Sequence, residues 1–277
     1  MSRLEIFGHT HIGRKRTSNQ DSYLAIEFDR MGMSRHLLAV ADGMGGHAGG
    51  DIASEIAVTT LRDSVLQSAE SATAVSVSDV LMNAVRAANE AVFEMACTDD
   101  RLQGMGTTVV AALAVNRAVA IANVGDSRAY LIDGDSIRRV TADHAWEEEA
   151  AALQQLTAEE IAASPFRGMV TRSLGVGSDV DVDLFHEELE GGQYLFLCSD
   201  GVHRHVEEGQ IRETVTRLED PESICRGIIA LANQAGGSDN ITCVVARQVG
   251  SSGRPGRGHG DKTRKIKNQA VDVEPPS

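Results

Sequence analysis

The chain has 277 residues, of which 42% are hydrophobic and 24% are charged, as expected for a globular protein with a sizeable buried core. Its 26 Lys and Arg against 40 Asp and Glu give a net charge of −14, which argues against a nucleic-acid-binding surface. The N-terminus has no apolar signal segment and no run approaches the length of a membrane span, so we expect a cytoplasmic protein without membrane contact.

Nine segments have the apolar or alternating composition of β-strands. They are residues 23–28, 36–41, 108–115, 118–124, 128–132, 136–140, 180–186, 193–198 and 241–247. Asn116-Arg117 and Asp133-Gly134 each separate two of these segments. Both pairs predict tight hairpins and therefore antiparallel pairing.

Helices are predicted where apolar residues recur every 3.6 positions, over 52–67 and 78–96, the second with Met95 on its buried face. A third helix is predicted to begin at Pro221, after an Asp220 cap, and to end at Gly236. Hairpins together with long helices predict a sheet-on-sheet core that is covered by helices.

Four cysteines lie in apolar surroundings without a Cys-x-x-Cys pair, so we expect reduced core residues of an intracellular protein. They are Cys97, Cys198, Cys225 and Cys243.

Residues 1–249 contain no internal repeat and no Pro-rich linker, which predicts one domain. Residues 250–277 are basic and almost free of apolar side chains, which predicts a disordered tail.

Several predicted strands meet a loop at an aspartate. Asp42 and Asp200 each stand at the end of a strand before a Gly, and Asp239 stands just before the last strand. Asp21 and Asp126 lie at two further strand–loop junctions. No basic residue adjoins Asp42 or Asp200 in the sequence, so a cluster of these acids would be costly without a cation. Such oxygen ligands suit Mg²⁺ or Mn²⁺.

Eight motifs occur in a fixed order, and together they resemble the metal-dependent serine/threonine phosphatases of the protein phosphatase 2C type in their bacterial style. The motifs are Arg16-TSNQD, Ala41-DGMGG, Gly106-TT, Ala122-NVGDSRAY, Thr141-ADH, Thr171-RSLG, Cys198-SDG and Asp239-NIT. The resemblance implies an α+β fold, a four-layer α-β-β-α sandwich of two antiparallel sheets flanked by helix pairs. It also implies a metal cleft at one end of the sandwich.

The resemblance further implies roles for particular residues. Asp42 would bridge two Mn²⁺ or Mg²⁺ ions, the Gly43 carbonyl would bind one of them, and Asp200 and Asp239 would complete the first ion's shell. Asp126, together with Asp200, matches a third metal site of bacterial members.

Two more residues take roles by the same resemblance. Asp21 would order metal-bound waters, and Arg16 would hold the substrate phosphate. The implied reaction is hydrolysis of phosphoserine and phosphothreonine in proteins by a hydroxide that bridges two ions. The implied partners are phosphorylated proteins and a Ser/Thr protein kinase that the enzyme opposes. The absence of a long heptad repeat favours a monomer.

Three positions depart from the pattern of many relatives. Met44 stands where animal members carry a His that is proposed to protonate the leaving oxygen, which leaves the leaving-group acid unassigned. His11 and Gln20 stand where many relatives have acidic residues. Residues 145–169 would form a flap beside the site, with a capping box at Thr157 and with Glu147–Glu149 facing solvent.

Three alternative functions fit parts of the sequence. The spacing from Cys198 to Arg204 matches the Cys-x5-Arg signature of cysteine phosphatases, although Asp200 inside that loop would repel the phosphate. A Gly-x-Gly-x-x-Ala run from Gly43 mimics a dinucleotide-binding turn, although Asp42 would face the pyrophosphate. A non-catalytic phosphoprotein-binding domain of the same fold is the third, although it would be expected to lack one of the central aspartates.

Overall fold

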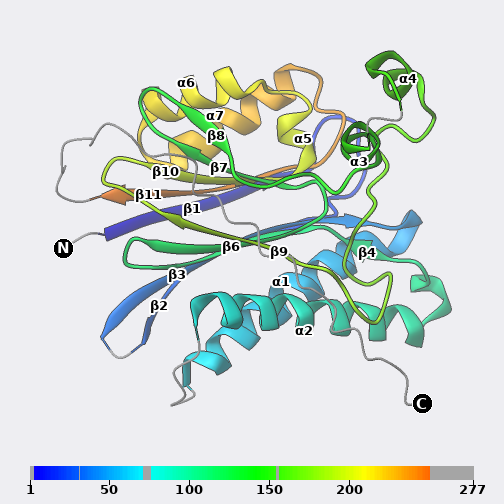
Figure 1. Ribbon diagram of the computed structural model, residues 1–277, viewed down its shortest axis with the longest axis horizontal. Helices are drawn as coiled ribbons and strands as arrows, with labels where there is room; N and C mark the ends of the chain where they lie inside the picture. The colour runs from blue at the N-terminus through cyan, green and yellow to red at the C-terminus, as the bar shows by residue number, and fades with distance from the viewer. Residues whose placement is uncertain (1–2, 31, 71–75, 154–155, 250–277) are drawn as a thin grey trace, which may run out of the picture.

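The computed structural model describes residues 3–30, 32–70, 76–153 and 156–249, so the predicted tail over 250–277 lies outside the described residues. Two antiparallel sheets stack face to face (Figure 1). The first sheet has the strand order β1 (Arg3–His11), β11 (Ile241–Val249), β10 (Tyr194–Cys198), β7 (Arg128–Ile132) and β8 (Ile137–Arg139). The second has the order β2 (Asp21–Arg30), β3 (Met33–Met44), β5 (Val109–Val115), β6 (Ala118–Val124) and β9 (Asp183–Glu188), with β4 (Gly106–Thr107) paired to the end of β3.

A helix pair covers the outer face of each sheet. The second sheet is covered by α1 (Gly46–Glu70) and α2 (Val77–Thr98), and the first sheet by α6 (Glu208–Leu218) and α7 (Pro221–Gln234). The remaining helices are short: η1 (Asp100–Leu102), α3 (Trp146–Ala152), α4 (Ala158–Ala163) and α5 (Asp200–His203). The predicted four-layer sandwich is therefore confirmed.

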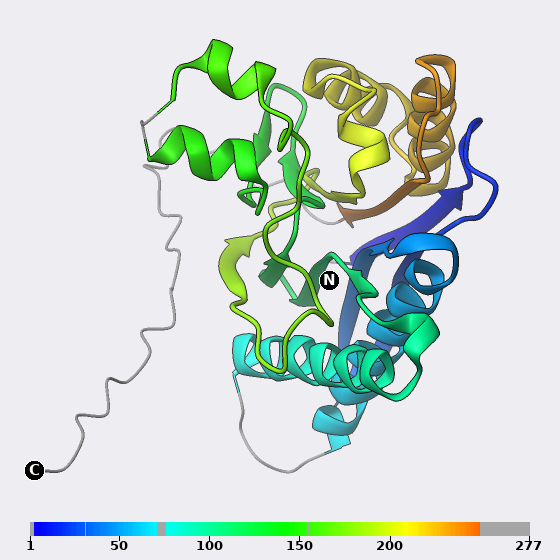
Figure 2. The same ribbon diagram turned by 90° about the vertical axis from the view of Figure 1, so that its right-hand side faces the viewer.

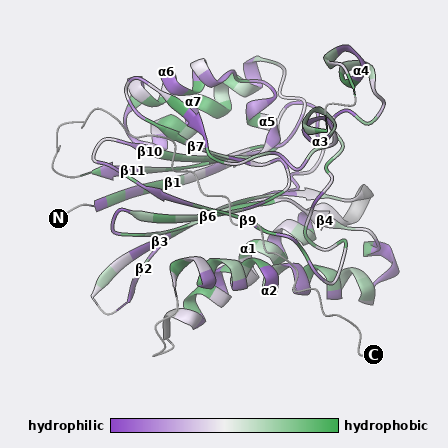
Figure 3. Cartoon of the chain, viewed as in Figure 1, coloured by the Kyte–Doolittle hydropathy of each residue, from purple (hydrophilic) through white to green (hydrophobic). Residues whose placement is uncertain are grey.

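Three hydrophobic cores hold the four layers together, one between the sheets and one under each helix pair. Strand β3 shows why its sequence is continuously apolar, since Leu37 and Ala39 face the helices whereas Leu38 and Val40 face the first sheet. Both faces of the central strands are thus buried, and hydrophobic residues concentrate on the strands and inner helix faces (Figure 3).

The nine predicted strands and three predicted helices are all present. Met95 is nevertheless 40% exposed near the end of α2, and Cys97 is exposed, while the other three cysteines are buried and free. Six elements were not predicted from the sequence: β1, β4, η1, α3, α5 and α6. Strand β1 is an edge strand that mixes charged residues and histidines, and its pairing with β11 joins opposite ends of the chain.

Two connections place loops from both sheets at one end of the sandwich. The chain crosses from the second sheet to the first between β6 and β7, and it returns to the second sheet between β8 and β9. The flap helices α3 and α4 project from this end (Figure 2). No helix of the described residues is long and apolar enough to cross a membrane.

Candidate functional site

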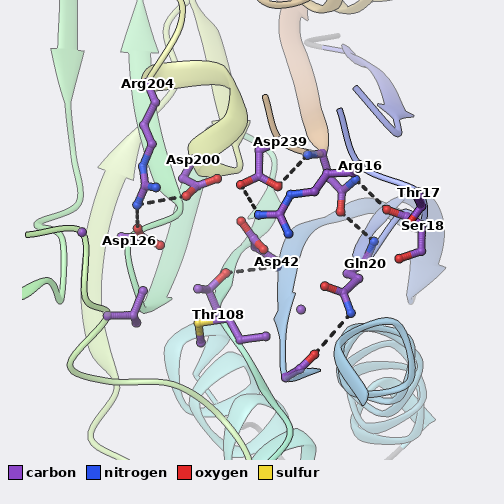
Figure 4. Close-up of a pocket in the computed structure, with 16 residues that line it drawn as sticks. Arg16, Thr17, Ser18, Gln20, Asp42, Thr108, Asp126, Asp200, Arg204 and Asp239 are labelled. Atoms are coloured by element: carbon purple, nitrogen blue, oxygen red, sulfur yellow. Dashed lines mark hydrogen bonds and ion pairs between the residues drawn. The ribbon is translucent and has the colours of Figure 1, made fainter. Parts of the chain in front are cut away.

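A pocket of about 540 Å³ lies at the end of the sandwich where loops from the two sheets meet (Figure 4). Its lining is mostly polar and includes six of the seven predicted site residues. They are Arg16, Asp42, Gly43, Asp126, Asp200 and Asp239. Residues far apart in the chain are therefore brought together as the motifs predicted.

The seventh predicted residue, Asp21, lies beside the pocket without lining it. It stands directly opposite Asp42 in the β2–β3 register, and it is buried. The Ser199 hydroxyl donates to its Oδ2 at 2.8 Å, whereas its Oδ1 has no hydrogen-bond partner among the described residues. Burial, with the nearby charges of Asp200 and Asp239, raises the pKa of Asp21 to about 7.

Asp42 is held at the end of β3 by the Gly-Thr-Thr motif. Its backbone N–H donates to the Thr108 hydroxyl at 3.1 Å, and its carbonyl accepts from the Thr107 hydroxyl and the Thr108 N–H, both at 2.9 Å. Burial and the neighbouring aspartates, Asp21 first, raise the pKa of Asp42 well above its usual range. The sequence analysis listed this motif but gave it no role, which is now clear: it orients Asp42.

Gly43 is required by the close approach of neighbouring backbone. A β-carbon there would clash with the carbonyl oxygen of Gly50 and lie 2.6 Å from that of Gln20. The Gly43 N–H donates to the same Gln20 carbonyl at 3.1 Å. The glycine thus lets the neighbouring backbone pass close to the end of β3 beside Asp42, where Gly43 lines the pocket.

Asp200 and Asp239 come from the first sheet. Asp200 begins α5 directly after β10, and Asp239 precedes β11 with a side chain that is 25% exposed. Burial raises the pKa of Asp200, and Asp239 adds repulsion while Arg204 opposes the rise. The Asp200 Oδ1 is buried without a hydrogen-bond partner among the described residues.

Asp126 lies where the chain crosses between the sheets, in the loop from β6 to β7. Its side chain is 6% exposed, and burial with the charge of Asp200 raises its pKa to about 6. Its carbonyl oxygen accepts a hydrogen bond from Nε2 of His203 at 3.0 Å, and burial lowers the pKa of that imidazole to about 3. This bond joins the Asp126 loop to α5 and so to Asp200.

Two arginines stand among the acids. Arg16 Nη2 is 2.7 Å from Asp239 Oδ2, and Arg204 Nη2 is 3.0 Å from Asp200 Oδ2 and 3.2 Å from Asp126 Oδ2. No basic residue adjoins Asp200 along the chain, but one turn of α5 brings Arg204 back over it. In the sequence, Arg204 had stood out only as the arginine of a Cys-x5-Arg spacing.

The acids still outnumber the cations, and their chemistry fits a divalent ion. The ligand set is all oxygen, and Asp21 and Asp200 each keep a buried, unpartnered carboxylate oxygen. Raised pKa values at several aspartates show that ionising them together is unfavourable, and a bound cation would remove that penalty. Among the described residues, no three His, Cys, Asp or Glu side chains are already arranged to hold a metal ion. Arg16 and Arg204 form ion pairs with Asp239 and Asp200 instead.

Asn240 fixes the loop that carries Arg16. Its Nδ2 donates to the carbonyls of Ile12 and Ser18, both at 3.0 Å, and its Oδ1 accepts from the Gln20 N–H at 2.8 Å. Three hydrogen bonds from one buried side chain therefore tie the N-terminal loop to the start of β11. The sequence analysis had quoted Asn240 beside Asp239 without a role.

The flap is anchored at its base by a bridge between Ala145 and Val170. The predicted capping box at Thr157 is confirmed and opens α4. Glu149 is exposed, as predicted, whereas Glu147 and Glu148 are half-buried. Glu147 accepts from the Gly168 N–H at 2.9 Å, and the other two bind side chains outside the flap.

Two alternatives conflict with the structure. Cys198 is fully buried in β10, and burial raises the pKa of its thiol, the opposite of what a thiolate nucleophile requires. The strand pairings of both sheets are antiparallel, so the run from Gly43 does not belong to a parallel dinucleotide-binding sheet.

Comparisons with known proteins point to one family. The family model described as protein phosphatase 2C matches residues 7–241. The serine/threonine phosphatase stp of Listeria innocua is 35% identical over 246 residues, which cover 88% of this chain and 96% of that protein.

Solved structures show the same likeness. The serine/threonine phosphatase of S. agalactiae has a TM-score of 0.79 at 34% identity, with 88% of this chain and 99% of that chain covered. The catalytic domain of the phosphatase PstP, solved in complex with two manganese ions, has a TM-score of 0.75 at 30% identity. That match covers 90% of this chain and 100% of that chain.

Proposed function

Because the chain belongs to the protein phosphatase 2C family, we propose that it hydrolyses phosphoserine and phosphothreonine in proteins, with Mn²⁺ or Mg²⁺ bound in the aspartate pocket. The observation that carries the proposal is the convergence of buried carboxylates from both sheets on one pocket. Such a set of acids is stable only with cations or protons among them.

The proposed ligands follow from the positions of the side chains. Asp42 lies centrally and would bind both ions. The Gly43 carbonyl would bind one of the two ions, and Asp200 and Asp239 would complete the ligands of the first ion. Asp21, just behind Asp42, would orient bound water through its unpartnered Oδ1. When bound, two such ions lower the pKa of the attacking water and neutralise charge on the phosphate.

Arg16 is the proposed phosphate-binding residue. Its side chain is 50% exposed at the pocket rim, and Asp239 engages only one terminal nitrogen of the guanidinium. The remaining N–H groups can donate to phosphate oxygens, first in the substrate and then more strongly as charge develops. The Asn240 hydrogen bonds keep this loop in place while the phosphate binds.

The leaving oxygen needs a proton, and the pocket aspartates would be held as carboxylates on the ions. Of the described residues that line the pocket, none is His, Cys, Lys or Tyr, and Met44 occupies the position beside Gly43. We propose that a water molecule in the pocket protonates the departing serine or threonine oxygen. A Ser/Thr protein kinase as the opposing partner, a monomeric state and a cytoplasmic location stay predictions.

The first test is hydrolysis of p-nitrophenyl phosphate and of a phosphothreonine peptide, with Mn²⁺ and with chelator. We expect activity only with the divalent ion, and a loss of roughly 100-fold or more in kcat for Asp42→Asn. Asp63→Asn, which removes an exposed acid on α1, is the matched control and should keep full activity.

Either outcome is informative. Metal-dependent turnover that collapses in Asp42→Asn would support the hydrolytic mechanism and exclude the non-catalytic binding domain. An inactive wild-type protein with every divalent ion tried would overturn the proposal and favour that binding domain.

A further inference from the structure

Arg204 lines the pocket but has no role in the proposed reaction. It caps the C-terminal end of α5, four residues after Asp200, and its backbone N–H donates to the Asp200 carbonyl at 2.9 Å. This bond fixes the start of the Arg204 side chain one helical turn above the Asp200 carboxylate. The arginine is thereby built into the same short helix as a central acid.

The Arg204 guanidinium bridges two acids, Asp126 in the loop from β6 to β7 and Asp200 just after β10. The single Nη2 atom of Arg204 lies 3.0 Å from Asp200 Oδ2 and 3.2 Å from Asp126 Oδ2 (Figure 4). The two carboxylates are only 10% and 6% exposed, whereas the Arg204 side chain is 44% exposed. The acids form a fixed, buried pair, and the cation reaches them from the solvent side.

The Asp126–Asp200 pair has the properties of a cation site in its own right. Both carboxylates are buried, and the Asp200 Oδ1 has no hydrogen-bond partner among the described residues. A divalent ion on these oxygens and the guanidinium would stand within a few ångströms of each other. Because like charges repel strongly at that distance, a divalent ion and the Arg204 guanidinium cannot both occupy the Asp126–Asp200 pair at the same time.

We propose that Arg204 is an intrinsic cation that occupies the Asp126–Asp200 pair and competes there with a third divalent ion. This inference rests on the proposed function, which places divalent ions in the pocket. The chain then binds two ions tightly at Asp42, Asp200 and Asp239, and a third only weakly. Arg204 acts through the acids, so it is a positioning residue and not a catalytic one.

The flap lies next to the contact between Arg204 and the two aspartates. Gly168 lines the pocket, and a β-carbon placed on it would lie 3.8 Å from Arg204 Nη2. The flap backbone therefore runs beside the guanidinium and limits the directions in which it can withdraw. A third ion would have to displace Arg204 outward, past this segment.

The test is a count of bound Mn²⁺ by isothermal titration calorimetry and by Mn²⁺ electron paramagnetic resonance, on the full chain. We expect two tightly bound ions in the wild type. Arg204→Gln should bind one further ion, with the affinity for the weakest site increased roughly tenfold or more. Arg204→Lys, which keeps the charge, should resemble the wild type.

Two controls separate this effect from a general loss of charge. Arg226→Gln removes an arginine from another i,i+4 ion pair, with Glu222 on α7, and should leave the Mn²⁺ count unchanged. Adding Asp126→Asn to Arg204→Gln should abolish the gained ion. If Arg204→Gln does not fold, Arg204→Met keeps the aliphatic stem and makes the same prediction.

The failures are distinguishable. Two ions in the wild type together with an unchanged count and affinity in Arg204→Gln and Arg204→Met would overturn the role of Arg204 and leave the proposed function standing. A gained ion that persists when Asp126 is also replaced would overturn the assigned location. No Mn²⁺ binding by the wild type would overturn the proposed function and this inference with it.

Discussion

Single aspartates in the pocket carry the clearest electrostatic signature. Asp21 is buried opposite Asp42, and its pKa is raised from an ordinary value near 3.8 to about 7. A group whose pKa is raised on folding binds its proton more tightly in the native state. In the metal-free protein, the contribution of Asp21 to stability is therefore fully present below about pH 4, and it is lost as the pH rises to about 7.

Asp21→Asn should remove this penalty. With chelator present, we expect Asp21→Asn to raise the free energy of unfolding more at pH 8 than at pH 5. The difference between the two pH values should be on the order of 2–4 kcal/mol. The asparagine carbonyl can still accept from the Ser199 hydroxyl, so the fold should be retained. Urea unfolding at the two pH values measures the difference, and Asp63→Asn should show no such pH dependence. An equal effect of Asp21→Asn at both pH values would contradict the prediction.

At the scale of the element, the loop between β1 and β2 depends on one side chain from the other end of the sequence. Asn240 supplies three hydrogen bonds to this loop, which carries Arg16 at the pocket rim. The loop has no helix or strand of its own. Its conformation is thus set by Asn240 more than by its local sequence.

Asn240→Ala should loosen the loop and raise KM for a phosphothreonine peptide roughly tenfold, with a smaller fall in kcat, because Arg16 would be less well placed. Trypsin should also cleave faster at the basic residues of the loop. Asn89→Ala is the control: it removes a buried side chain that bonds Gly175 N–H and the Gly177 carbonyl, and it should destabilise without raising KM. Unchanged KM in Asn240→Ala would argue against this role.

At the scale of the whole molecule, the two sheets meet through a pocket full of negative charge. Loops from both sheets contribute acids, so a bound cation links the sheets as well as serving chemistry. Ions that bind only the folded state stabilise it by mass action. Because the ligands bind as carboxylates, this stabilisation should weaken as the pH falls.

Saturating Mn²⁺ should therefore raise the melting temperature. Two sites at about 100 times Kd stabilise by about 5 kcal/mol, which corresponds to roughly 10–20 °C at neutral pH. At pH 5 the shift should be less than half as large, since burial and neighbouring carboxylates raise the pKa values of the proposed ligands Asp42 and Asp200, so protons compete with the ions there. Thermal unfolding followed by circular dichroism measures both shifts. A Mn²⁺ effect that is equal at the two pH values would count against carboxylate ligation.

The sequence alone was sufficient for features that depend on neighbours along the chain. The apolar runs of β3, β5 and β10 predict buried strands, and hairpin residues such as Asn116 predict their antiparallel pairing, because turn chemistry and side-chain alternation are local. The pocket aspartates were also found locally, since each stands where a strand meets a loop. Their convergence came from the order of the motifs, through the family resemblance.

The tertiary structure decided what depends on distance in space. Strand β1 pairs with β11 from the opposite end of the chain, and Arg204 reaches Asp126 across 78 residues. Asn240 is likewise separated from Ile12 by 228 residues. No local pattern specifies such contacts, because they arise only when packed layers bring separate loops to one end of the sandwich. The acids of the site and Arg16 could thus be read from the sequence, whereas Arg204 and the hydrogen bonds that hold the acids required the fold.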